Sequence, residues 1–205
     1  MPRIAEGRSP AEPTSLEQKH RYARILRVAT EHGMRQPMER VQMTEVARDA
    51  GVAIATLYRY FPSKRALFTA ALHAQVSRLT TTLVPRDESV SAAEAVADVL
   101  VRAGEQLLAR PLLAQTMLQS NNASVGAVEQ GGTGVTRAFR RALLLAADIE
   151  APDDLDERLI RVVEQTWYGI IISVLNGFIS AEEAEVDTRM ACARLLIDLG
   201  EPRPH

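Results

Sequence analysis

The chain has 205 residues, of which 46% are hydrophobic and 24% charged, a composition typical of globular proteins and unlike that of disordered ones. Its one cysteine, Cys192, excludes an internal disulfide framework and a multi-cysteine zinc site, and suits a reducing cytoplasm. The longest apolar run, residues 166–179, is too short to span a bilayer, and residues 1–13 lack the apolar stretch of a signal peptide. We therefore expect a soluble, cytoplasmic protein with no membrane partner.

The net charge of −2 conceals an uneven distribution along the chain. Residues 1–65 carry 12 Lys and Arg against 7 Asp and Glu, whereas residues 66–205 carry 12 against 19. This asymmetry favours an amino-terminal part that meets a polyanion. Chance variation of the surface explains the charge alone equally well, so a local motif has to decide.

The amino-terminal quarter predicts an arm followed by short helices. Residues 1–14 hold three prolines and no apolar period, so they are predicted to form a flexible arm. Ser15 is a plausible N-cap for a first helix that ends near Gly33 and Pro37. Two short helices are predicted at about residues 42–50 and 53–60, and Ser63 caps a longer one that reaches about residue 83.

The rest of the chain predicts further helices. They cover about residues 91–109, 111–119, 135–147, 155–178 and 181–199, with a glycine-bearing stretch between the second and third. Residues 169–174 resemble a strand, but they continue a longer helical period. The predicted fold class is all-α, with about nine helices.

Two short helices joined at Gly51 are typical of a helix-turn-helix, whose second helix enters the major groove of DNA. Glycine suits the cramped backbone of the turn, and Leu57 and Phe61 are predicted to face the core. Thr56 offers a hydroxyl to an oxygen and a methyl to a thymine. Tyr58, Tyr60 and Lys64 are predicted to face outward and contact phosphates, which positions a protein without reading sequence.

The segment AGVAIATLYRYFPSK resembles the DNA-binding signature of the TetR family of transcriptional regulators, and the helical layout resembles that family throughout. The resemblance implies a DNA-binding domain at residues 15–62 and a ligand-binding and dimerisation domain at residues 63–205. It also implies DNA contacts at Thr44, Ala53, Ile54, Thr56, Tyr58, Tyr60 and Lys64.

Three positions depart from the family pattern. Gln42 stands where a Ser or Thr often caps the second helix, which puts capping there in doubt. Thr44 stands where an arginine is frequent, which removes one positive charge that could contact a phosphate. Ala55 replaces the usual glycine. The same segment, together with ARPLLAQTM, resembles the KstR-like steroid-catabolism repressor branch. That branch implies a bulky apolar effector, such as a sterol-derived acid or its coenzyme A thioester.

The carboxy-terminal helices predict an interface and a cavity. Residues 166–179 are apolar nearly all round, so they form either a central core helix or one side of a twofold interface with the last helix. The family resemblance favours a homodimer that reads a near-palindromic operator. The effector site implied by the resemblance is lined by residues that pack equally well as plain core: Leu107, Leu108, Leu113, Met117, Phe139, Val163, Thr166 and Trp167.

No catalytic or metal-binding constellation is evident in the sequence, so we expect neither an enzyme nor a cofactor. The four histidines are scattered, and Cys192 lies in an apolar helical context. The expected function is a ligand-responsive DNA-binding regulator, most simply a repressor. The alternative is a helical carrier or sequestering protein for an apolar metabolite that binds no DNA.

Overall fold

The computed structural model describes residues 10–83, 86–123 and 134–200. Within these residues the chain forms nine α-helices and no strand, which confirms the predicted all-α class. No helix among them is long and apolar enough to cross a membrane. The helices are α1 (Leu16–Arg35), α2 (Met43–Asp49), α3 (Ile54–Tyr60), α4 (Lys64–Thr81), α5 (Ala92–Leu108), α6 (Pro111–Ala123), α7 (Gly134–Ala146), α8 (Asp154–Leu175) and α9 (Ala181–Leu195).

The helix starts follow from local capping chemistry. Ser15 and Ser63 accept a hydrogen bond from the amide three residues on, as predicted for both positions. Ser91, Asp153 and Ser180 each form a reciprocal capping box. Such caps satisfy amides that the first turn leaves without a partner, so the sequence fixes these starts to within a residue.

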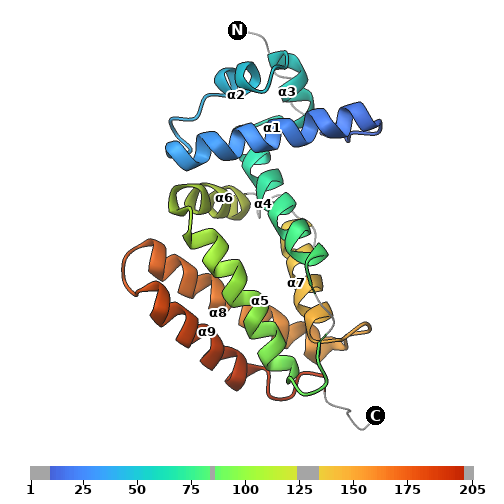
Figure 1. The fold of residues 1–205 in the computed structure, drawn as a ribbon, viewed down its shortest axis with the longest axis vertical. Helices are drawn as coiled ribbons and strands as arrows, with labels where there is room; N and C mark the ends of the chain where they lie inside the picture. Colours follow the sequence, from blue (N-terminus) through green and yellow to red (C-terminus); the bar gives the residue numbers. More distant parts are fainter. Residues whose placement is uncertain (1–9, 84–85, 124–133, 201–205) are drawn as a thin grey trace.

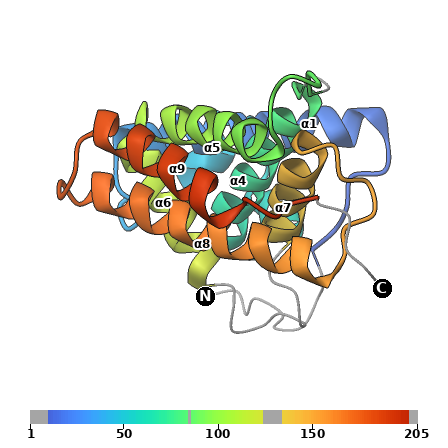
Figure 2. The same ribbon diagram turned by 90° about the horizontal axis from the view of Figure 1, so that it is seen from below.

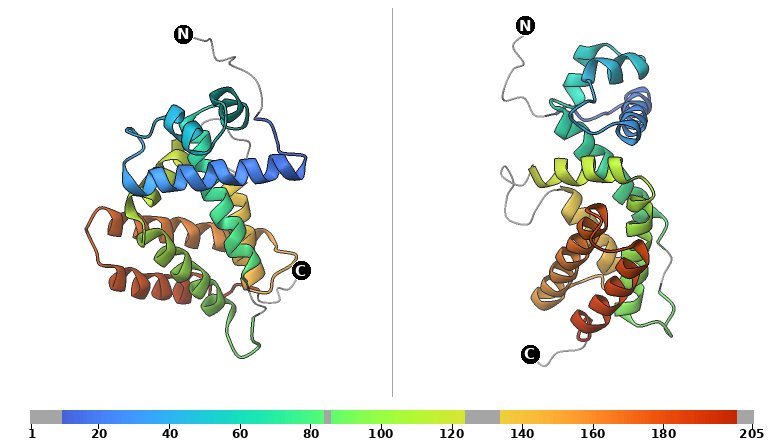
Figure 3. Two further views of the ribbon diagram at one scale, coloured as in Figure 1. Left: turned by 45° about the horizontal axis from the view of Figure 1, so that its top comes forward. Right: turned by 90° about the vertical axis from the view of Figure 1, so that its left-hand side faces the viewer.

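Helices α1, α2 and α3 form a unit at one end of the molecule (Figures 1 and 3). The face of α2 that points inward carries Val46 and Ala47, and Ala50 follows it into the core. Residues of the predicted arm are part of this unit, because the Ala11 amide donates to the Arg59 carbonyl at 3.0 Å. The remainder of that arm, residues 1–9, lies outside the described residues.

Helix α4 leaves this unit and runs into the larger helical body, where it packs against α6 and α7 (Figure 1). Helix α6 crosses beneath α1 and packs on it as well. The predicted boundary after residue 62 therefore falls at the start of a helix that belongs physically to both parts. Two helices, rather than a linker, connect the amino-terminal unit to the body.

At the opposite end, α8 and α9 pack side by side, and α9 also packs against α5 (Figure 2). Trp167 and Ile171 of α8 are buried, but Phe178 just after the helix is 77% exposed. Residues 166–179 are therefore covered on one side only, which contradicts the reading of a central core helix within one protomer. The side that stays uncovered needs another explanation.

Candidate nucleic-acid interface and effector cavity

The turn between α2 and α3 has the geometry that the sequence predicts. Gly51 has a φ of 61°, a left-handed conformation that side chains disfavour, and the Val52 amide donates to the Ala47 carbonyl at 2.9 Å. Leu57 and Phe61 are fully buried, as expected, and they hold α3 against the core. Helix α3 thus lies on the outside of a helix-turn-helix.

The outer face of this motif carries most of the residues that were expected to contact DNA. Thr44 on α2, Ala53 before α3 and Ile54 at its first position are exposed. Thr56 and Tyr58 are half-buried beside them. Gln42 makes no side-chain cap for α2, so the doubt raised by the sequence at that position is justified. The arrangement leaves small and mixed polar–apolar side chains free to approach a groove wall.

Tyr60 does not face outward, so the prediction for this residue is wrong. Its side chain is 2% exposed, and its ring meets that of Tyr22 edge-on with centroids 5.6 Å apart. The Tyr60 hydroxyl accepts from Arg59 Nη2 at 3.3 Å, and the same guanidinium lies 5.1 Å from the ring centroid. Tyr60 therefore anchors α3 on α1 and is not a free phosphate contact.

Lys64 also differs from expectation. Its ammonium donates to the backbone carbonyls of Met38 and Glu39, at 2.9 and 3.2 Å. These carbonyls account for a lysine in the first turn of α4, so no external phosphate is needed to explain it. Lys64 ties α4 to the turn after α1. The neighbouring Arg65 is exposed and makes no ion pair among the described residues.

Two further contacts fasten α1 to the end of α2. Arg24 Nε donates to the Ala50 carbonyl at 2.8 Å, and His32 Nε2 lies 2.9 Å from an oxygen of Asp49. Hydrogen bonds from Arg48 and His32 to the Asp49 carboxylate lower the pKa of that group. The DNA-facing helices are thus held rigidly relative to α1.

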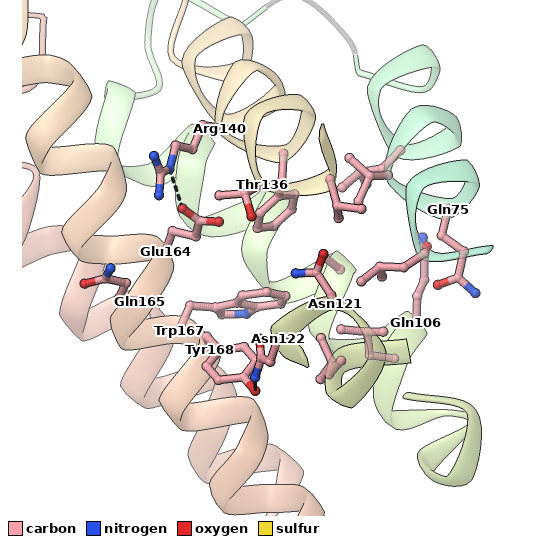
Figure 4. A pocket seen from close by; sticks show the side chains of 18 residues that line it. Gln75, Gln106, Asn121, Asn122, Thr136, Arg140, Glu164, Gln165, Trp167 and Tyr168 are labelled. Carbon is pink, nitrogen blue, oxygen red and sulfur yellow. Dashed lines mark hydrogen bonds and ion pairs between the residues drawn. The ribbon is translucent and has the colours of Figure 1, made fainter. Parts of the chain in front are cut away.

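A cavity of about 340 Å³ lies in the helical body, a size at the lower end of the range for small-molecule sites (Figure 4). Three of the eight predicted effector contacts, Leu107, Phe139 and Trp167, line it. The rings of Phe139 and Trp167 pack with centroids 5.3 Å apart. Asn121 and Asn122 of α6 also line the cavity.

The other five predicted effector residues do not line this cavity. Leu113, Met117 and Val163 are buried in the hydrophobic core. Thr166 donates its hydroxyl to the Val162 carbonyl of its own helix, at 3.0 Å. Leu108 instead lines a second cavity of about 420 Å³ between α5, α8 and α9. The structure thus places these side chains in the core, on their own helix or beside a different cavity, and their contact with an effector stays a prediction.

Sequence reasoning missed the contribution of α4 and most of the polar lining. Leu72, Gln75, Val76 and Leu79 form the α4 wall of the cavity. Apolar residues at this spacing predict only a buried helix face, so the sequence carries no signal for a cavity there. The missed residues from other helices are Ala103, Gln106, Leu118, Val135, Thr136, Arg140, Glu164, Gln165 and Tyr168.

Comparison with known proteins agrees with this architecture. The family model described as "Bacterial regulatory proteins, tetR family" matches residues 25–71. The model described as "Tetracyclin repressor-like, C-terminal domain" matches residues 90–195. The chain belongs to the TetR family of transcriptional regulators, as its helix-turn-helix segment predicts.

Individual relatives cover nearly the whole chain. The chain is 31% identical over 197 residues to the HTH-type transcriptional repressor KstR of Rhodococcus jostii, covering 93% of this chain and 89% of that protein. It is 30% identical to KstR of Mycobacterium tuberculosis, covering 91% and 85% of the two chains. A crystal structure of a TetR transcriptional regulator from Rhodococcus sp. RHA1 superposes with a TM-score of 0.81 at 44% identity, covering 90% of this chain and all of that one.

These matches confirm the fold and the resemblance to the KstR-like branch. The chain is a DNA-binding transcriptional regulator, and its relatives are regulators and not enzymes. The individual DNA and effector contacts are set by this chain's own side chains, so they have to be argued from its geometry.

Proposed function

We propose that the protein is a cytoplasmic, ligand-responsive repressor, which binds a near-palindromic operator as a homodimer and leaves it when a small apolar effector occupies the cavity of about 340 Å³. Its KstR relatives are named transcriptional repressors, which supports repression over activation. The observation that carries the proposal is that two helices, α4 and α6, both line the cavity and pack against α1 of the amino-terminal unit.

The first shared helix is α4. Its first turn follows α3 directly, and Lys64 in that turn holds the carbonyls of Met38 and Glu39. Its later turns supply Leu72 and Val76 to the cavity wall. A ligand that displaces Leu72 and Val76 therefore shifts α4, and the first turn of α4 sets the position of the helix-turn-helix.

The second shared helix is α6. Leu118 and Asn122 of α6 line the cavity, while Leu113 at its other end packs against Gly33 of α1. Ser120 Oγ lies 3.2 Å from the sulfur of Met38, in the turn that Lys64 holds. An effector that moves α6 therefore acts on α1 and on that turn together. Because the coupling is thermodynamic, operator binding must weaken effector binding by the same factor.

We assign the DNA contacts from the outer face of the motif. Ile54 and Thr56 on α3 are placed to meet base edges, while Thr44, Ala53 and Tyr58 are placed to meet the backbone of DNA. The exposed Arg65 supplies a positive charge that contacts a DNA phosphate at the start of α4, in place of Lys64.

The uncovered apolar surface supports a homodimer through α8 and α9. Val186 and Met190 are 64% and 56% exposed, and with Ala193 they follow the helical spacing of one face of α9. Phe178 extends this surface at the end of α8. Ala184, Thr188 and Cys192 occupy the opposite, buried face of α9. Two such surfaces can meet across a twofold axis, which sets two α3 helices about 34–36 Å apart for successive major grooves.

The test is fluorescence anisotropy with the DNA segment immediately upstream of the protein's own gene, across a salt series, with decan-1-ol as an effector probe. We expect affinity to fall steeply with salt and to fall further when decan-1-ol is added. Thr56→Ala should change the preference among operator variants, while Arg65→Gln should weaken binding to all sequences alike. Lys19→Gln, which removes an exposed charge from the first turn of α1, is the matched control for Arg65.

Two results would contradict the proposal. A protein that binds decan-1-ol but no DNA at low salt would be a carrier. DNA affinity that stays unchanged at saturating decan-1-ol, as judged by Trp167 fluorescence, would mean that this cavity does not regulate operator binding.

A further inference from the structure

The charged lining of the cavity consists of one ion pair. Among the described lining residues, Arg140 on α7 and Glu164 on α8 are the charged ones. Arg140 Nε donates to Glu164 Oε2 at 2.6 Å, and the two side chains are only 24% and 15% exposed (Figure 4). The pair brings a cation and an anion to one end of the cavity with no net charge.

Arg140 keeps donors available after this contact. Nε makes this contact, and the two Nη groups make no hydrogen bond or ion pair with other described residues. Burial raises the pKa of Glu164, and the hydrogen bond from Arg140 opposes that rise. The carboxylate is thus already dependent on Arg140 for its stability as an anion.

The remaining polar lining is neutral. Asn122 Nδ2 donates to the hydroxyl of Tyr168, and Asn121 lies beside Trp167 toward the middle of the lining (Figure 4). Gln75 and Gln106 lie across the cavity from the ion pair (Figure 4). The walls between these polar groups are apolar, with Leu72, Leu107, Phe139 and Trp167 among them. The lining therefore offers hydrogen bonds at opposite sides of an apolar space and a balanced charge.

A balanced, partly buried ion pair disfavours charged ligands. A ligand carboxylate near Arg140 also lies near Glu164, and it takes the cation away from an anion that is poorly hydrated. A ligand ammonium near Glu164 meets the Arg140 guanidinium in the same way. In either case one buried charge stays uncompensated, which is costly away from bulk water. A neutral oxygen that hydrogen-bonds to the polar lining leaves the ion pair balanced and avoids this penalty.

We propose that the effector is an uncharged molecule with an apolar body and a neutral carbonyl or hydroxyl oxygen that hydrogen-bonds to the polar lining of the cavity. The proposal rests on the assignment of this cavity as the effector site. It excludes a free carboxylic acid as the preferred ligand, although the KstR-like resemblance alone implies a sterol-derived acid. It also places the phosphates of any coenzyme A thioester outside the cavity.

The test compares four probes of similar length: decan-1-ol, decan-2-one, decanoate and decylamine at pH 7. Trp167 is the only tryptophan in the chain and lines both cavities, so its fluorescence reports ligand binding, and the Arg140 and Glu164 variants described below assign that binding to this cavity. We expect the two neutral probes to bind about tenfold more tightly than either charged probe, since each charged probe unbalances the ion pair. Decanoate or decylamine binding as tightly as decan-1-ol would overturn the proposal.

Two variants each remove one charge of the pair, so that they give the site net charges of opposite sign. Glu164→Gln leaves Arg140 unpaired and should move the preference to decanoate. Arg140→Gln leaves Glu164 unpaired and should move it to decylamine. Glu31→Gln breaks the exposed Arg27–Glu31 pair on α1, whose atoms lie 2.7 Å apart, and should change nothing. Far-UV circular dichroism establishes that each variant is folded, and the wild-type series decides the matter if one is not.

The outcome separates this inference from the proposed function. If neutral probes bind best but operator affinity does not change, the ligand class stands and the regulatory role fails. If a charged probe binds best and still releases the operator, the regulatory role stands and the ligand class is wrong.

Discussion

Gly33 of α1 and Leu113 of α6 meet so closely that there is no room for a methyl group between them. A Cβ atom on Gly33 would lie 2.8 Å from Leu113 Cδ1 and 2.9 Å from Cε1 of Phe68. Real side chains do not approach to this distance, so the helix that reaches the cavity is seated directly against the long helix of the DNA-binding unit. The absence of a side chain at one position permits this seating.

Gly33→Ala should lower the free energy of unfolding by about 1–3 kcal/mol, because the added methyl overpacks this junction. Leu113→Ala should cost about 2–5 kcal/mol by leaving a cavity. The double variant should cost clearly less than the two together, because each change relieves the other. Chemical unfolding of all four proteins measures the coupling, and strictly additive losses would show that the two side chains do not compete for space.

The two tyrosines of α3 should respond differently to loss of their hydroxyls. Tyr58→Phe should weaken operator binding severalfold, because its half-buried phenol lies on the outer face. Tyr60→Phe should leave operator affinity nearly unchanged, since that hydroxyl is turned inward to Arg59. Tyr60→Ala should destabilise the fold by about 3–5 kcal/mol, as for other buried aromatic rings. Equal losses of DNA affinity in the two phenylalanine variants would contradict the geometry.

The surface of α8 and α9 should govern assembly. Met190→Glu places a charge at the centre of the exposed apolar surface and should convert a dimer to a monomer, which sedimentation velocity detects. The matched control, Glu157→Gln, changes an exposed charge in the first turn of α8. A Met190→Glu protein that sediments exactly as the wild type would exclude this surface as the interface.

Cys192 should be chemically silent in the folded protein. It is buried on the inner face of α9, and burial raises the pKa of its thiol to about 11. At pH 8 the thiolate is scarce and the sulfur is covered, so a disulfide reagent such as Ellman's should react only after unfolding in guanidinium. Rapid reaction of one thiol per chain under native conditions would contradict this placement.

Acid should weaken the junction between α1 and α2. Hydrogen bonds from Arg48 and His32 lower the pKa of Asp49. A carboxyl whose pKa is lower in the folded state than in the unfolded state stabilises the folded state. The full contribution is present above the unfolded-state pKa of about 4, and it is lost as the pH falls through the lower folded-state pKa. Asp49→Asn should therefore be less stable than the wild type at pH 7, with a difference that shrinks toward pH 3. A difference that is constant over this range would assign the effect to something other than the charge.

Local chemistry made much of the fold predictable from the sequence. The serine caps at Ser15 and Ser63, the glycine turn at Gly51 and the buried Leu57 each depend on neighbours a few residues away. These features placed the helix-turn-helix correctly, but not the side chains of Tyr60 and Lys64.

Contacts between distant segments were not predictable in the same way. Tyr60 is buried because Tyr22 of another helix covers it, and the carbonyls that hold Lys64 lie 25 and 26 residues earlier in the chain. The cavity was only partly predicted for the same reason. An apolar helix face looks alike in sequence whether it meets another side chain or an empty space.

Helix α4 runs without interruption from the end of the helix-turn-helix to the wall of the cavity, and this restricts how such a regulator can be rebuilt. A chimaera that joins this helix-turn-helix to the carboxy-terminal helices of a distant relative must interrupt α4. It must also keep Leu113, or a residue of the same shape, against Gly33. Operator preference can change through the few exposed side chains of α3, and ligand preference through those around Arg140. Helix α4 lies between these two sets of side chains, so a change in either specificity has to preserve this helix.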